Sequence, residues 1–292
     1  MVSNGHRTDD RRGPIPRKAF LPHGKILERE VSIMAYRYVT PRIDCGVLEC
    51  DIMESTHAMI AGAAGSGKSV LLRRCLLYAA AKGYETILID PKKLELKRWK
   101  DAINTRAFAC TIDSIVQVLR DTCELMDRRY ASVTDPFQTM CDGSTIWVVI
   151  EEYADLMCSD RKREIKALVQ RLAQLGRAAK IHVLLCTQRP TRDIIDGAIK
   201  VNITTRCALH VPTAQDSRNI INENGAEHLP YRGQAYLLLD SGDIDLYNTH
   251  MIDEDLEHQV IAYMNDRKAE SLQPIPVPVP QKKKSFLQRL FA

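Results

Sequence analysis

Several kinds of signal are missing from this chain, and each absence excludes a class of protein. No apolar run reaches the ~18–20 residues of a membrane-spanning helix, and the polar N-terminus lacks the apolar core of a secretion signal. The nine cysteines include no Cys-x-x-Cys pair, which argues against a zinc or dithiol motif. The formal net charge of +4 permits nucleic-acid binding without indicating it. We expect a cytoplasmic protein that reaches a membrane, if at all, peripherally through its partners.

The composition predicts one large domain between two arms. The 292 residues are 45% apolar, which is enough for a sizeable core. Residues 1–45 are interpreted as a polar arm with a short lead-in element, and residues 46–270 as the folded domain. Residues 271–292 are interpreted as a Pro-rich, basic tail, because the alternating prolines of 274–284 favour an extended polyproline II conformation.

Short apolar runs alternate with helical patterns through the predicted domain. The expected strands are His57 to Ala61, Thr86 to Asp90, Ala107 to Cys110, Ile146 to Ile150, Ile181 to Thr187, Cys207 to Val211 and Ala235 to Leu239. The expected helices are Ser69 to Lys82, Ile112 to Arg129 and Arg161 to Ala178. Strands separated by helices predict an α/β fold with a mainly parallel sheet and helices on both faces.

The strongest motif is a phosphate-binding loop after the first predicted strand. The segment from Gly62 to Ser69 matches G-x-x-x-x-G-K-[ST] and opens a predicted helix. Backbone N–H groups of the loop and the positive end of the helix would face the phosphates of ATP. Lys68 would contact the β- and γ-phosphates, and the Ser69 hydroxyl would bind Mg²⁺. The expected nucleotide-contacting residues are Gly62, Ala63, Ala64, Gly65, Ser66, Gly67, Lys68, Ser69 and Val70.

Hydrolysis also requires an acidic element, which the strand Ile146 to Ile150 supplies at its end. We assign Glu151 to the metal and Glu152 to the attacking water. Aspartate is the usual first residue, and the alternative is a solvated strand end. Gln188 ends another predicted strand, where it is a candidate for sensing the γ-phosphate or holding the water. A structural role for Gln188 is equally open.

Seven segments, which occur in one order between residues 46 and 265, carry a family resemblance. They are HAMIAGAAGSGKSVLL, ILIDPKKLEL, WVVIEEYADLM, LGRAAKIHVLLCTQRP, IKVNITTR, DSRNIINENGAEHL and RGQAYLL. The chain resembles the FtsK/SpoIIIE family of DNA translocases, of a reduced type found in mobile elements or viruses. The membrane-spanning and winged-helix regions of the larger members have no counterpart in this sequence.

The resemblance implies a RecA-like P-loop NTPase domain that forms a homo-oligomeric ring, a hexamer, around double-stranded DNA. ATP would lie between subunits, and Arg177 would act as an arginine finger on the neighbour's ATP; the alternative is a helix-terminal arginine. Arg206 is a second candidate for an intersubunit role. Asp90, Lys92 and Glu95 match a family segment and are candidates for linking the nucleotide to the DNA-facing surface, with loop solvation as the alternative.

The sequence therefore predicts an ATP-driven translocase of double-stranded DNA for conjugative or mobilisation transfer. A relaxase or a membrane secretion machinery is an implied partner. Viral genome packaging is the alternative within the motor class, and an ATP-binding scaffold with little turnover is the alternative outside it. The basic candidates for DNA contact are Lys92, Lys93, Arg192 and Lys200.

Overall fold

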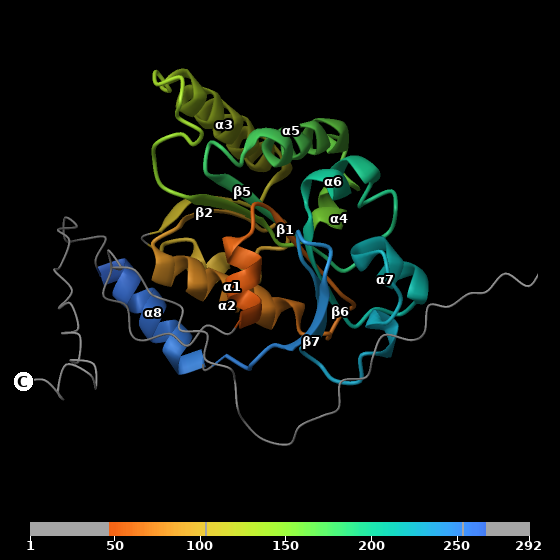
Figure 1. Ribbon diagram of the computed structural model, residues 1–292. Helices are drawn as coiled ribbons and strands as arrows, with labels where there is room; N and C mark the ends of the chain where they lie inside the picture. The colour runs from red at the N-terminus through yellow and green to blue at the C-terminus, as the bar shows by residue number, and fades with distance from the viewer. Residues whose placement is uncertain (1–46, 103, 253, 267–292) are drawn as a thin grey trace, which may run out of the picture. The chain divides into compact units, whose positions relative to one another are not determined.

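The computed structural model describes residues 47–102, 104–252 and 254–266, which are shown in colour in Figure 1. The predicted domain falls almost wholly within these ranges. The predicted arm at 1–45 and the Pro-rich tail at 271–292 lie outside the described residues. Within the described part, no helix is both long and apolar enough to cross a lipid bilayer.

An eight-stranded sheet in the order β3-β2-β4-β5-β1-β6-β7-β8 forms the centre of the domain. From β3 to β6 in this order, every neighbouring pair of strands is parallel. The last two pairs, β6 with β7 and β7 with β8, are antiparallel. The strands are β1 (Ala58–Ala61), β2 (Glu85–Ile89), β3 (Thr105–Ala109), β4 (Ile146–Ile150), β5 (Ile181–Thr187), β6 (Thr205–Leu209), β7 (Gln234–Leu238) and β8 (Ile244–Asn248). The predicted, mainly parallel α/β sheet is confirmed.

Helices cover both faces of the sheet (Figure 1). One apolar layer lies under α3, α5, α6 and α7, and the other lies under α1, α2 and α8. The helices are α1 (Val47–Glu54), α2 (Lys68–Lys82), α3 (Ile112–Ala131), α4 (Tyr153–Leu156), α5 (Lys162–Leu175), α6 (Gly197–Asn202), α7 (Ala214–Ile221) and α8 (Glu254–Asp266).

The sequence analysis located the longer elements and missed several others. The predicted helices correspond to α2, α3 and α5, whose apolar faces repeat over several turns. The remaining helices were not predicted; apart from α8 they have eight residues or fewer. Strand β8 was missed because it lies at the edge of the sheet and has no buried residue. Strand β6 begins at Thr205, earlier than predicted, because polar Thr205 and Arg206 are buried there.

Parallel pairing brings the carboxyl ends of three central strands, β1, β4 and β5, together at one end of the sheet. Ala61 at the end of β1 pairs in register with Thr187 at the end of β5. Ile150 at the end of β4 pairs with Leu185 on the other side of β5. The segments that follow these strands are therefore neighbours, although they are far apart in the sequence.

A buried carboxylate fixes α8 to the domain. The Glu257 side chain is fully buried and accepts hydrogen bonds from Arg73, from Arg98 (3.1 Å) and from the Trp99 indole (3.1 Å). Burial alone would raise the pKa of Glu257, but the hydrogen bonds and charges of Arg73 and Arg98 hold it below its ordinary value. The docking of α8 thus depends on one carboxylate that pairs with two cations.

We predict that Glu257→Ala lowers the free energy of unfolding by about 3 kcal/mol, because breaking a buried ion pair leaves its partners uncompensated. Urea unfolding at pH 7 measures the loss. Glu254→Ala is the matched control: it lies on the same helix and faces Arg73 at 3.7 Å, but its side chain is 72% exposed, so we expect a change within about 0.5 kcal/mol. Equal losses in both variants would contradict the assignment.

The stability difference between the parent and Glu257→Ala should depend on pH. Since the pKa of Glu257 is lowered in the folded state, its contribution is present above the ordinary value of 4.5 and is lost as the pH falls below it. We therefore expect the stabilities of the parent and Glu257→Ala to converge as the pH falls from 4.5 through the lowered folded-state pKa of Glu257.

Candidate functional site

The loop between β1 and α2 has the conformation of a phosphate-binding loop. Gly67 caps α2 at a φ of 107°, in the left-handed region that favours glycine. A Cβ at Gly62 would come within 2.6 Å of Ser66 Oγ and 2.8 Å of Leu209 Cβ. Of the expected contact residues, Gly62 to Gly67 form this loop and Lys68 to Val70 begin α2; the crest of the loop at Ala64 and Gly65 is exposed.

Backbone hydrogen bonds from other segments hold the loop in place. Gly62 N–H donates to the carbonyl of Thr187 (3.2 Å), and Ala63 N–H donates to the carbonyl of His210 (2.8 Å). Gly233 N–H donates to the carbonyl of Ser66 (2.8 Å), so the turn before β7 supports the loop. The cradle is therefore fixed from β5, β6 and β7, and it is preformed for an anion.

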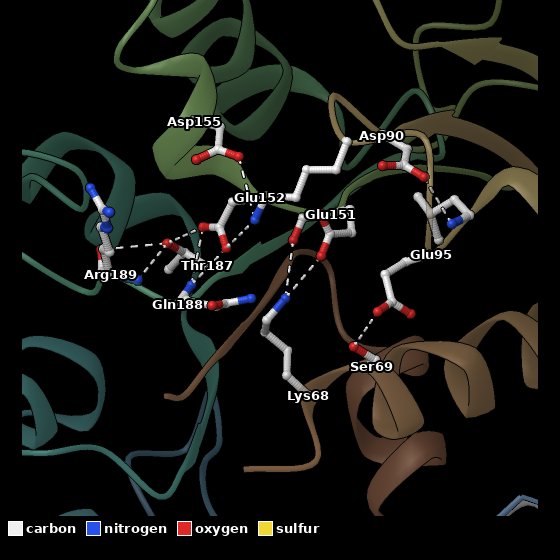
Figure 2. A network of polar contacts seen from close by, with 12 residues as sticks. Lys68, Ser69, Asp90, Glu95, Glu151, Glu152, Asp155, Thr187, Gln188 and Arg189 are labelled. Carbon is white, nitrogen blue, oxygen red and sulfur yellow. Dashed lines mark hydrogen bonds and ion pairs between the residues drawn. The ribbon is translucent and has the colours of Figure 1, made fainter. Parts of the chain in front are cut away.

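Lys68 lies in a buried ion pair with the first residue of the acidic element. Its Nζ is 3.2 Å from Glu151 Oε1 and 3.4 Å from the Glu151 carbonyl oxygen (Figure 2). Burial alone would lower the pKa of Lys68, but the charges of Glu151 and Glu152 raise it above its ordinary value. Burial also raises the pKa of Glu151, against the attraction of Lys68. A further cation beside Glu151 would therefore stabilise its charged form.

Glu152 points away from Lys68 and toward the end of β5. Its carboxylate accepts hydrogen bonds from Thr187 Oγ1 (2.8 Å) and from Gln188 N–H (3.1 Å) (Figure 2). Lys92 Nζ lies 3.8 Å from Glu152 and 3.4 Å from Asp155. The two adjacent glutamates thus have separate surroundings, as the prediction of separate roles requires. That prediction of roles is not itself tested by the geometry.

The predicted metal residues present the ligand type that Mg²⁺ prefers. Ser69 Oγ and the Glu151 carboxylate are oxygen donors, and Glu151 Oε2 is buried without a hydrogen-bond partner among the described residues. Ser69 Oγ donates to Glu95 Oε1 at 3.0 Å. The described ranges contain no group of three or more His, Cys, Asp or Glu side chains able to hold a metal.

Arg177 is a predicted site residue that lies away from the phosphate loop and the acidic pair of its own chain. It follows α5 and precedes the first residue of β5, whereas Gln188 follows the last. Its exposed side chain has no hydrogen bond or ion pair within the described ranges. Gly176 makes this turn possible, since a Cβ there would lie 2.1 Å from the carbonyl oxygen of Ile181. Arg177 therefore lies at the opposite end of β5 from the phosphate loop of its own chain.

Sequence reasoning did not identify every residue that shapes the site. Thr187 donates to Glu152, Asp155 pairs with Lys92, and Gly233 supports the phosphate loop. The position of Thr187 at a predicted strand end, next to Gln188, was a usable signal. Asp155 and Gly233 gave no local signal, because their contacts come from the fold.

Comparison with known proteins now identifies the domain. Residues 39–136 and 136–192 match the sequence profile of the FtsK/SpoIIIE family. The chain belongs to the FtsK/SpoIIIE family. The domain that carries the site is therefore a P-loop ATPase domain, as the sequence predicted.

Several relatives in this family are named DNA translocases. The chain is 31% identical over 253 residues to DNA translocase FtsK of Lactococcus lactis subsp. lactis, an alignment that covers 77% of this chain and 33% of the relative. It is 34% identical over 203 residues to DNA translocase FtsK of Borreliella burgdorferi, covering 63% and 26% respectively. The alignments thus span about a third or less of those longer proteins.

Two solved structures share the fold of this domain. The conjugation coupling protein TcpA of pCW3, in a monomer form with ATPγS, matches with a TM-score of 0.62 and 24% identity, over 73% of this chain and 66% of that one. The cytoplasmic domain of the type VII secretion ATPase EccC of Thermomonospora curvata matches with a TM-score of 0.64 and 21% identity, over 77% and 30%. At these identities the likeness establishes the P-loop fold alone.

We predict that Glu152→Gln binds ATP but hydrolyses it ~10²–10⁴-fold more slowly, because the amide cannot take a proton from water. Glu151→Gln should instead raise the Mg²⁺ concentration needed for half-maximal turnover. Steady-state phosphate release across a Mg²⁺ series, together with binding of a fluorescent ATP analogue, measures both effects. If Glu151→Gln alone abolished turnover at saturating Mg²⁺, the two roles would be reversed.

Proposed function

We propose that this domain hydrolyses ATP to move double-stranded DNA; the names of its relatives state DNA translocation for those proteins. The observation that carries the proposal is the pair of adjacent buried glutamates with different partners, facing a preformed phosphate loop. One glutamate faces the phosphate-binding lysine, and the other is held by the end of β5. A scaffold that only bound ATP would not require this second, separately held carboxylate.

Nucleotide binding would rearrange one ion pair. Lys68 would exchange Glu151 for the β- and γ-phosphates, which releases the Glu151 carboxylate toward the Mg²⁺ site beside Ser69. Bound Mg²⁺ would neutralise charge on the phosphates. Glu152, held by Thr187 and the Gln188 backbone, would orient the attacking water and accept its proton. In Figure 2 the Gln188 side chain extends from β5 in the direction of Lys68, which supports its candidacy for contact with the γ-phosphate or the water.

The position of Arg177 supports a homo-oligomeric ring. Its guanidinium is exposed and lies at the other end of β5 from its own phosphate loop, so it is poorly placed to act within its own subunit. In a ring, a hexamer in our proposal, the same residue would face the ATP of the next subunit. There it would stabilise the charge that develops on the transferred phosphoryl group.

A cluster of cations on the α6 side of the sheet is the candidate DNA surface. Arg206 is only 7% exposed, and its buried Nε has no hydrogen-bond partner within the described ranges. Burial lowers the pKa of Lys200, and the nearby charges of Arg206 and Arg192 lower it further. Cations that repel one another and lack an acidic partner favour an anion, and DNA phosphates would supply it. Lys92 is a weaker candidate than the sequence suggested, because it pairs with Asp155.

The process that we propose is conjugative or mobilisation transfer, in which a relaxase or a membrane secretion machinery would be the partner. Genes beside the one that encodes this chain provide a simple test. A neighbouring relaxase gene would support conjugative or mobilisation transfer. Neighbouring capsid genes would instead indicate viral genome packaging, with the proposed motor activity unchanged.

We predict that duplex DNA stimulates ATP hydrolysis by the parent chain and that binding is salt-dependent and nearly indifferent to sequence. Lys200→Ala should weaken binding of every duplex similarly and reduce the slope of log K against log salt by about one. Lys82→Ala removes the same charge from the other face of the sheet and should leave the slope unchanged. Fluorescence anisotropy with several unrelated duplexes measures this. A strong preference for one short sequence, or equal effects of both variants, would contradict the proposed surface.

A mixing experiment tests the ring. Arg177→Ala should bind ATP normally and hydrolyse it on the order of 10³-fold more slowly, as expected for loss of an arginine finger. Mixing Arg177→Ala subunits with Glu152→Gln subunits should restore part of the activity, since some interfaces then combine an intact Glu152 with a neighbour's Arg177. Co-purification of differently tagged subunits is the control for mixed assembly. If mixed rings form but hydrolyse ATP no faster than either variant alone, Arg177 does not act on the neighbouring subunit. Arg206 would then be the next residue to substitute.

A further inference from the structure

The phosphate-loop serine has a carboxylate partner that comes from outside the acidic element. Ser69 Oγ donates a hydrogen bond to Glu95 Oε1 at 3.0 Å (Figure 2). Ser69 is the residue whose hydroxyl is expected at the Mg²⁺ site, while Glu151 is engaged by Lys68. The serine is therefore oriented by the segment after β2 and not by the strand-end glutamate.

The loop after β2 is built to hold Glu95 in this place. The fully buried Asp90 carboxylate accepts hydrogen bonds from Lys93 N–H (2.8 Å) and Leu96 N–H (3.0 Å). Lys93 adopts a φ of 60°, which tightens the turn. Leu96 is completely buried on the C-terminal side of Glu95, so the chain is anchored before and after it. Glu95 thus reaches Ser69 from a fixed backbone.

A cation on α2 lies near the same carboxylate. Arg73 is four residues after Ser69, so both side chains lie on one face of the helix. Hydrogen bonding to Glu257 raises the pKa of Arg73 above its ordinary value, and the charges of Glu254 and Glu95 add to this shift. Arg73 therefore offers Glu95 a favourable electrostatic environment while Glu257 holds Arg73 in position.

We propose that Glu95 positions the Ser69 hydroxyl for Mg²⁺ in the nucleotide complex, an inference that rests on the proposed ATPase site. A hydroxyl has one proton and two lone pairs. When Glu95 accepts the proton, the lone pairs of Ser69 Oγ are left for the metal. Glu95 is a positioning residue: it acts on the metal through Ser69 and does not itself contact the ion or the phosphates.

Binding of Mn²⁺, used in place of Mg²⁺, tests this without relying on turnover. Electron paramagnetic resonance of free Mn²⁺ reports the metal affinity of the full chain with bound ADP. Glu95→Ala should weaken Mn²⁺ binding by ~10–100-fold, the usual effect of removing a group that orients a metal ligand. Glu95→Gln retains an acceptor oxygen and should recover most of the affinity. The matched control Glu124→Ala, with a side chain that is 68% exposed on α3, should leave it unchanged.

A double-mutant cycle with Ser69→Ala shows whether Glu95 acts through the serine. We expect Ser69→Ala and Ser69→Ala/Glu95→Ala to bind Mn²⁺ equally weakly. A further loss in the double variant would mean that Glu95 contacts the metal directly, and an unchanged affinity in Glu95→Ala would mean that it has no role there; either result overturns the inference. If Glu95→Ala does not fold, Glu95→Asp, with its shorter side chain, replaces it. Unaltered Mn²⁺ binding by Glu95→Asp would likewise overturn the inference.

The outcome for the inference can be separated from that for the proposed function. Binding of ADP without metal should be the same in the parent and Glu95→Ala, because Ser69 acts on the metal. If the parent binds ADP and Mn²⁺ but the Glu95 variants match it, only the inference fails. If the parent binds no nucleotide at all, both fail.

Discussion

The site depends on the parallel register of β1, β4 and β5. This register places the phosphate loop, the acidic pair and Gln188 together at the carboxyl end of the sheet, because each of them directly follows one of these strands. A slip of one residue in any of these strands would turn each of its side chains toward the opposite apolar layer and would displace the groups that follow the strand. The buried apolar residues of the strands, which specify the register, therefore also determine the geometry of the catalytic groups.

Charge balance within the site explains its arrangement without nucleotide. Lys68, Glu151 and Glu152 are each at least 96% buried, and burial of a charge without a partner is costly. Lys68 and Glu151 are partners in a buried ion pair, and in the proposed nucleotide complex phosphate and metal would take over the two roles. Each half of the pair is thus held where its ligand would bind. The same principle applies at Glu257, where a fully buried carboxylate pairs with Arg73 and Arg98.

Two helices connect the nucleotide site with more distant parts of the domain. Helix α2 begins at the phosphate loop and carries Arg73, whose partner Glu257 fixes α8. Helix α5 ends at Leu175, and the exposed Arg177 lies in the turn between α5 and the start of β5. In the proposed ring, changes at one nucleotide would therefore reach α8 through α2, while the nucleotide of the neighbouring subunit would be reached through Arg177.

The sequence by itself determined the features that lie in short contiguous segments. The phosphate loop, the acidic pair and the buried strand Ile146–Ile150 each have a local pattern, as do helices α2, α3 and α5. Only the tertiary structure decided which groups meet. Ser69 and Glu95 are 26 residues apart, Thr187 and Glu152 are 35 apart, and Arg73 and Glu257 are 184 apart. Such pairs leave no periodic signal, because they arise from strand order and loop shape. For the same reason, the burial of Arg206 among other cations could be seen only in the folded domain.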